Sequence, residues 1–145
     1  SILIIDDNEE ISSLLKDRFT RMGFSVYTAS EGKSGVEMAQ KFNPDLITMD
    51  FSMPGANGVE AYKELRQSSA TAVIPVLFFS STVTGLIRRM VSESRLVRFL
   101  KKPCEIAVIE KAISELLALP KEAPPPPLPD NAQKKPTPDD ETNWL

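Results

Sequence analysis

Five short apolar runs, spread over the first hundred residues, constrain the fold of this chain more than any other feature. They read ILIID, SVYTA, DLITMD, IPVLFFS and LVRFLK, and begin at residues 2, 25, 45, 74 and 96. Between them lie longer stretches with apolar residues at steps of three and four, which is the helical period. The first, third and fourth runs are apolar on both sides, as in strands covered on both faces. The alternation predicts an open, parallel α/β sheet with right-handed crossovers.

The helical stretches after the first and fifth runs show the period most clearly. The first helix is expected to open at Asn8 and to stop near Gly23, because asparagine caps helix N-termini and glycine helix C-termini. The predicted buried faces are Ile11, Leu15, Phe19 and Met22 in the first helix and Ile106, Ile109, Ile113 and Leu116 in the last. In this architecture, function gathers beyond the carboxyl ends of the strands.

Composition restricts the chemistry that the chain can support. It has 145 residues, of which 41% are hydrophobic, enough for one domain core. Cys104 is the only cysteine and there is no histidine, which excludes internal disulfides, zinc sites of the Cys/His type and histidine-dependent triads. The net charge of −3 gives no general attraction to nucleic acid or anionic membrane. With no signal-peptide pattern and no spanning run, a cytoplasmic location is expected.

Composition changes sharply at Pro120. Residues 120–145 contain eight of the 12 prolines, no glycine and an acidic DDE triplet. We therefore predict one domain over residues 1–119 and a proline-rich disordered tail or linker over 120–145. Two sharper alternatives are a PPPPLP ligand for an aromatic-lined groove and a docking tip formed by NWL, which holds Trp144, the only tryptophan.

Polar residues stand at the expected strand ends. Asp6 and Asp7 end the first run, Asp50 the third and Ser80 the fourth, and Lys102 follows the fifth. If the first and third strands are neighbours, three carboxylates converge and require a cation, and hard oxygen ligands favour Mg²⁺ or Mn²⁺.

A lysine and a hydroxyl beside such an ion suit phosphoryl oxygens, because they offset the charge that builds during transfer. In that setting Asp50 becomes a candidate carboxylate nucleophile that forms an acyl phosphate. Met53, Pro54 and Gly58 indicate that the chain turns tightly after it.

The motifs IIDDN, MDFSMPGANG, VLFFSS and RFLKKP, in this order and spacing, resemble the receiver domain of two-component response regulators, the CheY-like superfamily. The resemblance covers residues 1–119 and implies a flavodoxin-like (βα)5 fold, doubly wound, with strand order 2-1-3-4-5. It implies that Asp50 accepts phosphate from a histidine kinase or phosphotransfer protein. The implied metal ligands are Asp7, Asp50 and the carbonyl of Ser52, with Asp6 acting through a metal-bound water. Ser80 and Lys102 are implied to contact the phosphoryl group, with a cis Lys102–Pro103 peptide.

The resemblance also implies a switch, in which Ser80 moves toward the phosphate and Phe99 rotates inward. The interaction surface of the fourth helix, fifth strand and fifth helix then changes shape for a protein partner or a homodimer. For Phe99, a plain core role is an equal alternative. For the basic residues Arg88, Arg89, Arg95, Arg98, Lys101 and Lys102, the alternatives are a solvated face, an acidic partner and a nucleic-acid contact.

Three functions remain open at this stage. The first is a phosphoacceptor signalling module that is not an enzyme beyond its own phosphorylation and dephosphorylation. The second is a Mg²⁺-dependent phosphatase with an aspartate nucleophile, which usually carries a second aspartate where this chain has Ser52. The third is a phosphate-independent binding module. No DNA-binding domain is expected in the 145 residues, so output would pass through a protein partner.

Overall fold

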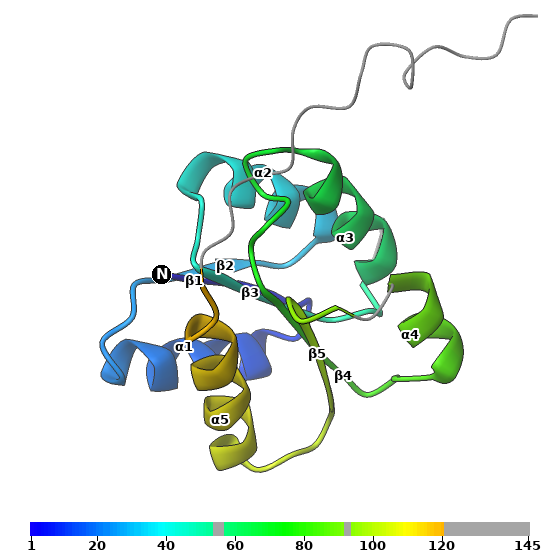
Figure 1. Cartoon of the computed structure of the whole chain (residues 1–145). Coiled ribbons are helices and arrows are strands. Elements are labelled where there is room, and N and C mark those ends of the chain that lie inside the picture. The colour runs from blue at the N-terminus through cyan, green and yellow to red at the C-terminus, as the bar shows by residue number, and fades with distance from the viewer. Residues whose placement is uncertain (54–56, 92–93, 121–145) are drawn as a thin grey trace, which may run out of the picture.

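A computed structural model describes residues 1–53, 57–91 and 94–120. The strands are β1 (Ile2–Ile5), β2 (Val26–Ala29), β3 (Leu46–Met49), β4 (Val76–Ser80) and β5 (Val97–Lys101). The helices are α1 (Glu9–Arg21), α2 (Gly32–Phe42), α3 (Gly58–Gln67), α4 (Gly85–Val91) and α5 (Ile106–Leu117). Strands and helices alternate along the chain, which confirms the predicted order of elements (Figure 1).

All the strands belong to one parallel sheet. Its order is β2-β1-β3-β4-β5, so β1 and β3 are neighbours near the middle and β5 forms one edge. The register pairs Ile5 with Met49 and Phe78 with Phe99. The predicted doubly wound sheet and its strand order are therefore confirmed, and the carboxyl ends of β1, β3 and β4 lie at one edge.

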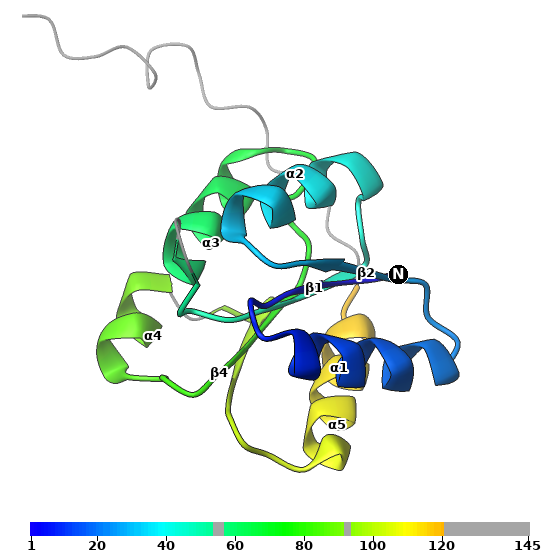
Figure 2. The ribbon, with the colours of Figure 1, turned by 180° about the vertical axis from the view of Figure 1, so that it is seen from behind.

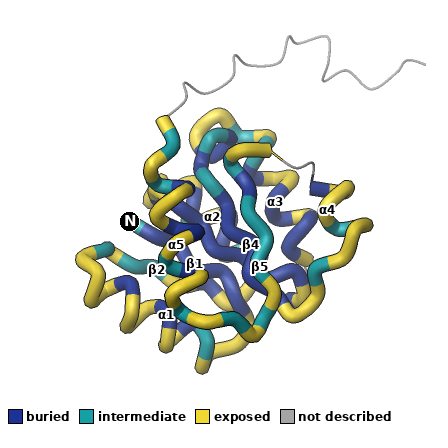
Figure 3. The backbone as a smooth tube through the Cα atoms, turned by 60° about the horizontal axis from the view of Figure 1, so that its bottom comes forward, coloured by how far each residue is buried: buried dark blue, intermediate teal, exposed yellow. Residues whose placement is uncertain are grey.

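Each face of the sheet carries its own apolar core. Helices α2, α3 and α4 lie on one side and α1 and α5 on the other (Figures 1 and 2). Residues of the central strands alternate between the two cores: Leu3 and Ile5 face α2 and α3, while Ile2 and Ile4 face α1 and α5. Because every residue of β1, β3 and β4 is buried, the interior runs through the centre of the sheet (Figure 3).

The caps of α1 follow the sequence signals. The Asn8 side chain accepts a hydrogen bond from the Ile11 backbone N–H, and Gly23 takes a φ of 98° just after the helix. Leu15 and Phe19 are buried as predicted. Met22 is 39% exposed because the helix has already ended at Arg21, so its assignment to the buried face was wrong.

The last helix also follows the prediction closely. Ile109, Ile113 and Leu116 are buried, and Ile106 is half-buried at the first position of α5. The predicted proline-rich segment lies outside the described residues apart from Pro120, so its assignment stays a prediction. Among the helices that the structure describes, none has the length and apolar character needed to cross a lipid bilayer.

Candidate functional site

The predicted carboxylates meet where β1 and β3 end. Asp6 and Asp7 directly follow β1, and Asp50 directly follows β3. The backbone N–H of Asp50 donates to the Ile5 carbonyl and that of Asp6 to the Ala29 carbonyl, each at 3.0 Å. The hydrogen bonding of the sheet thus continues through both residues, and their side chains start from a rigid backbone.

Carboxylate oxygens of Asp6, Asp7 and Asp50 all lie within 4.8 Å of one another. Asp6 and Asp50 are buried, at 5% and 7% exposure, whereas Asp7 is exposed. Three carboxylates at this spacing can hold a metal ion, and an all-oxygen donor set suits a hard divalent ion such as Mg²⁺. The donor set and the open side at Asp7 therefore fit the predicted ion.

Two further polar groups contact these carboxylates: Lys102, which directly follows β5, and Ser80, the last residue of β4. The Lys102 Nζ lies 2.6 Å from Asp6 Oδ2 and 3.4 Å from Asp50 Oδ2. The fully buried Ser80 hydroxyl donates to Asp50 Oδ1 at 2.6 Å. The Lys102 backbone N–H donates to the Ser80 carbonyl at 2.8 Å, which ties the two groups together. The structure thus brings a lysine, a hydroxyl and three carboxylates to one place, as predicted.

Burial and charge act in opposite directions on Asp6. Desolvation raises the pKa of the Asp6 carboxyl, and the hydrogen bond from Lys102 lowers it only in part. The Asn8 backbone N–H, which donates to Asp6 Oδ1 at 2.9 Å, also favours the ionised form. Because burial is the largest cause, one lysine does not fully compensate the buried carboxylate, and a divalent cation would do so.

The segment after Asp50 is packed closely against it. The Ser52 backbone N–H donates to Asp50 Oδ1 at 3.3 Å, and the Gly58 N–H donates to the Phe51 carbonyl at 3.0 Å. A Cβ on Gly58 would stand 2.3 Å from the Asp50 carbonyl oxygen. Only Gly23 among the described glycines has a positive φ, so Gly58 is needed for this close approach and not for its backbone angle. Pro54 lies outside the described residues.

Phe99 belongs to an aromatic stack that the sequence analysis missed. The Phe51 and Phe78 rings stack at 4.4 Å between centroids, and the Phe78 and Phe99 rings stack at 5.5 Å. Phe51 follows Asp50 directly, and Phe99 is half-buried, with the Arg88 guanidinium 4.8 Å over its ring. The stack joins the carboxylate site to the surface beside α4. A hint was available, since a phenylalanine stands within one to three residues of Asp50, Ser80 and Lys102.

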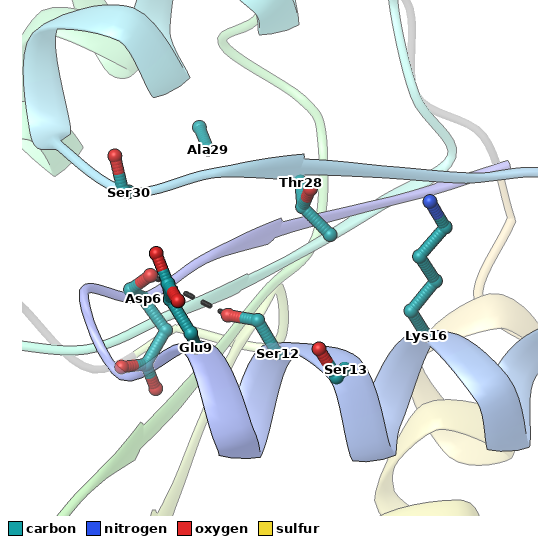
Figure 4. Close-up of a pocket in the computed structure, with 8 residues that line it drawn as sticks. All are labelled: Asp6, Glu9, Ser12, Ser13, Lys16, Thr28, Ala29 and Ser30. Carbon is teal, nitrogen blue, oxygen red and sulfur yellow. Dashed lines mark hydrogen bonds between the residues drawn. The ribbon is translucent and has the colours of Figure 1, made fainter.

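A polar cavity of about 340 Å³ opens beside Asp6, between α1 and the end of β2 (Figure 4). Its walls carry hydroxyls and charges, and the Ser12 hydroxyl donates to the Asp6 carbonyl at 3.4 Å. The lining residues are Asp6, Glu9, Ser12, Ser13, Lys16, Thr28, Ala29 and Ser30. Of the predicted site residues, Asp6 lines this cavity.

The Lys102–Pro103 peptide is cis, as the sequence resemblance implied. The predicted site residues lie at the carboxyl edge of the sheet, except Phe99, which lies on β5 behind that edge. The sheet order, the acidic cluster and the paired lysine and hydroxyl together define a CheY-like α/β domain with an acidic pocket.

The comparisons identify the family. Residues 2–114 match the model of the response regulator receiver domain, and the chain belongs to that family. It is therefore a receiver domain of two-component signalling, a family in which phosphorylation of an aspartate with Mg²⁺ is general. Protein PilH of Pseudomonas aeruginosa is 30% identical over 117 residues, which are 81% of this chain and 97% of PilH. The chemotaxis protein CheY of Thermotoga maritima is 29% identical over 116 residues, 79% of this chain and 95% of CheY.

Other relatives are longer. The alkaline phosphatase synthesis regulator PhoP of Bacillus subtilis is 38% identical over 80 residues, which are 55% of this chain and only 32% of PhoP. Among solved structures, the receiver domain of a Pseudomonas aeruginosa sensor histidine kinase, with magnesium in its active-site cleft, has a TM-score of 0.73 at 20% identity. The match covers 81% of this chain and 97% of the chain in that solved structure. At this identity the likeness shows the fold.

Proposed function

We propose that Asp50 accepts a phosphoryl group from the phosphohistidine of a histidine kinase or phosphotransfer protein. An Asp50 carboxylate oxygen attacks the phosphorus, the P–N bond breaks, and the histidine nitrogen keeps the electron pair. The observation that carries this proposal is the environment of Asp50, which is buried yet lies within hydrogen-bonding reach of Ser80 and Lys102.

The metal ligands that we propose are Asp7, Asp50 and the backbone carbonyl of Ser52, with Asp6 completing the metal site through a metal-bound water. Mg²⁺, or Mn²⁺ in its place, would offset the negative charge on the transferred oxygens when it is bound. Asp6 and Asp50 are both held by hydrogen bonds from backbone N–H groups, which supports a preorganised donor set. Asp7 is exposed and is the carboxylate most open to an incoming ion.

Lys102 and Ser80 are proposed to hold the transferred group. The Lys102 ammonium already bridges Asp6 and Asp50, so a small movement would let it contact a phosphoryl oxygen on Asp50. The Ser80 hydroxyl, now donating to Asp50, would turn to donate to that oxygen. Phe99, whose ring stacks on that of Phe78, would follow Ser80 inward.

Two surfaces support partners of this reaction. An apolar cavity of about 270 Å³ lies between α1 and the start of α5, beside Lys102, and the Leu14 side chain over it is 64% exposed. We propose that the phosphodonor protein docks there, which would place its histidine beside Asp50. The output surface, for another protein or a second copy of the chain, is proposed on α4, β5 and α5.

Receiver domains are generally not enzymes with turnover, and we propose that this one catalyses only its own phosphorylation and dephosphorylation. An aspartate-nucleophile phosphatase is less well supported, because Ser52 offers no carboxyl group to protonate a leaving group. A phosphate-independent module would not need the observed Ser80 and Lys102 contacts with Asp50. We also propose residues 1–119 as the domain, since α5 ends at Leu117.

Intact-protein mass after incubation with Mg²⁺ and acetyl phosphate tests the proposal. The native chain should gain one phosphoryl group, only with Mg²⁺, and Asp50→Asn should gain none. Asp17→Asn, on the exposed side of α1, is the matched control and should behave as the native chain. An adduct that persists in Asp50→Asn would contradict the assignment. No adduct, together with no stable beryllofluoride complex, would favour the binding module.

A further inference from the structure

A small groove beside β5 combines two guanidinium groups with an aromatic ring. Its volume is about 270 Å³, and it is lined by Arg88, Ser94, Val97, Arg98 and Phe99. Small-molecule pockets usually span about 300–1,000 Å³, so this groove suits a single side chain of a peptide better than a free ligand. The ring of Phe99 forms its apolar wall, and Arg88 lies across that ring.

The groove lies in the most basic part of the chain. Residues 81–101 contain four arginines, one lysine and one glutamate, a net charge of +4, whereas the whole chain carries −3. The remaining residues therefore sum to −7, and the charge is strongly segregated. The Arg98 guanidinium donates to the Val97 carbonyl at 3.2 Å, and within residues 1–53, 57–91 and 94–120 it makes no salt bridge with a carboxylate. A segment that suits this surface is acidic and carries one large apolar side chain.

The chain contains such a segment, DDETNWL, at residues 139–145. Three carboxylates precede Trp144, the only tryptophan, by three to five positions. Guanidinium groups pair with carboxylates and also stack on indole rings, so both parts of the segment match the groove. We propose that residues 139–145 dock in the groove between α4 and β5 of the same chain, with Asp139, Asp140 and Glu141 near the arginines and Trp144 against Phe99.

The described structure places the start of the tail close to this groove. Pro120 lines a cavity of about 180 Å³ together with Leu96, which directly precedes Val97 of the groove. The chain thus leaves the described region beside the beginning of β5. No long crossing of the molecule is needed to bring residues 139–145 to Arg98.

The length of the connection favours docking within one chain. Asp139 lies nineteen positions after Pro120 along the chain. A flexible chain of that length has a root-mean-square span of about 24 Å, at roughly 5–6 Å times the square root of the residue number. Proline stiffens part of it but does not shorten its reach. Linkers of this kind give effective concentrations of the order of millimolar, so even a dissociation constant near 1 mM would leave about half of the molecules docked.

Docking would cover the outer edge of Phe99, and here the inference rests on the proposed function. If Phe99 moves inward when Asp50 is phosphorylated, the apolar wall of the groove is lost and the segment is released. The docking itself needs no phosphate. A failure of docking and a failure of phosphorylation are therefore separate results.

Fluorescence of Trp144 in the 145-residue chain tests the docking directly, because these residues contain no other tryptophan. We expect emission shifted to shorter wavelength, and acrylamide quenching at least twofold weaker, relative to a synthetic peptide of residues 121–145. Arg98→Gln should return both readings to those of the peptide. The triple substitution D139N/D140N/E141Q should do the same, and it cannot unfold the domain because it lies in the tail.

Two control variants leave the groove and the acidic triplet intact, and Arg21→Gln has the same charge change as Arg98→Gln. Arg21→Gln removes an exposed arginine of α1, and Asp130→Asn removes a carboxylate of the tail outside the triplet. Both should keep the native fluorescence. Raising the salt to 1 M should weaken docking, because the Debye length falls to about 3 Å.

Three results would overturn the proposal. Peptide-like quenching of the native chain would show that the segment is undocked. Equal effects of Arg21→Gln and Arg98→Gln would show that only net charge matters. A shift that grows with protein concentration would show that the segment binds a second copy. The acetyl phosphate reaction of Arg98→Gln, measured in parallel, reports the proposed function independently.

Discussion

Replacing Gly58 with alanine should displace the backbone of the phosphoacceptor site. The added Cβ would lie 2.3 Å from the Asp50 carbonyl oxygen and 2.9 Å from the Phe51 Cα, whereas ordinary contacts begin at 3.4 Å. The chain must therefore move by 3.4 − 2.3 = 1.1 Å at the nearest atom. Both obstacles are backbone atoms beside a buried strand, so no flexible side chain can make room.

The expected cost follows from these contacts. Overpacking of this kind costs about 1–3 kcal/mol, and the hydrogen bond from the Gly58 N–H to the Phe51 carbonyl, worth about 0.5–1.5 kcal/mol, is weakened as the backbone moves. Alanine is favoured over glycine in a helix by about 1 kcal/mol, which offsets part of this. We expect a net loss of about 1–3 kcal/mol in the free energy of unfolding.

Gly85 supplies the matched control, because it also begins a helix and a Cβ there meets nothing within 4 Å. Gly85→Ala should leave stability unchanged or raise it by up to about 1 kcal/mol. Urea unfolding measures both variants, and the rate of phosphorylation by acetyl phosphate should fall for Gly58→Ala alone. If Gly58→Ala proves as stable as Gly85→Ala, the close approach does not constrain this turn and the reasoning is wrong.

Three further outcomes follow from the site and the core. Burial raises the pKa of Asp6 in the folded chain, so the protonated carboxyl stabilises the fold below the unfolded pKa, and this stabilisation is lost as the pH rises through the folded pKa. Without Mg²⁺, the free energy of unfolding of the native chain, relative to that of Asp6→Asn, should therefore fall as the pH rises across that window. Adding Mg²⁺ should reverse the loss. Ser80→Ala removes a charge-assisted hydrogen bond to Asp50 and should lower the free energy of unfolding, measured with urea, by about 1–3 kcal/mol. Ser81 is exposed and serves as the control, so an equal effect of Ser81→Ala would contradict this prediction. Phe78→Ala removes a fully buried ring and should lower the free energy of unfolding, measured by thermal unfolding, by about 3–5 kcal/mol. The control is Phe42→Ala, at a residue that is 40% exposed, and an equal or larger loss there would refute the role of the stack.

Apolar periodicity predicted most of the fold, because each strand was recognisable either by apolar residues on both sides or by the polar residue at its end. Parallel strands place such ends at one edge, so the meeting of Asp6, Asp50, Ser80 and Lys102 followed from strand order alone. Met22 is a residue for which the helical spacing predicted burial wrongly. Its spacing matched the buried face of α1, but the helix ended one residue earlier and left the side chain outside.

Contacts between residues on different strands could not be predicted from the sequence. Gly58 was predicted to serve the turn after Asp50, whereas its close approach to the Asp50 carbonyl is a contact that no local pattern reveals. The stack of Phe51, Phe78 and Phe99 depends on the register between β4 and β5 and on ring orientation. Pairing of that kind is set by tertiary packing, so residues read one at a time appear as ordinary core.

The position of Lys102 follows from the charges around it. Three carboxylates and one ammonium leave a formal charge of −2 at the carboxyl edge, which a divalent cation would bring to zero. Lys102 Nζ lies 2.6 Å from Asp6 and 3.4 Å from Asp50, so it pairs most closely with Asp6, whose pKa is raised by burial. Phosphorylation of Asp50 would exchange one negative charge for about two. The strongest unmet charge would then lie on the phosphoryl group, and the lysine would be drawn from Asp6 toward it. Arginine could not substitute for this movement, because its planar fork would fix one carboxylate in a bidentate pair.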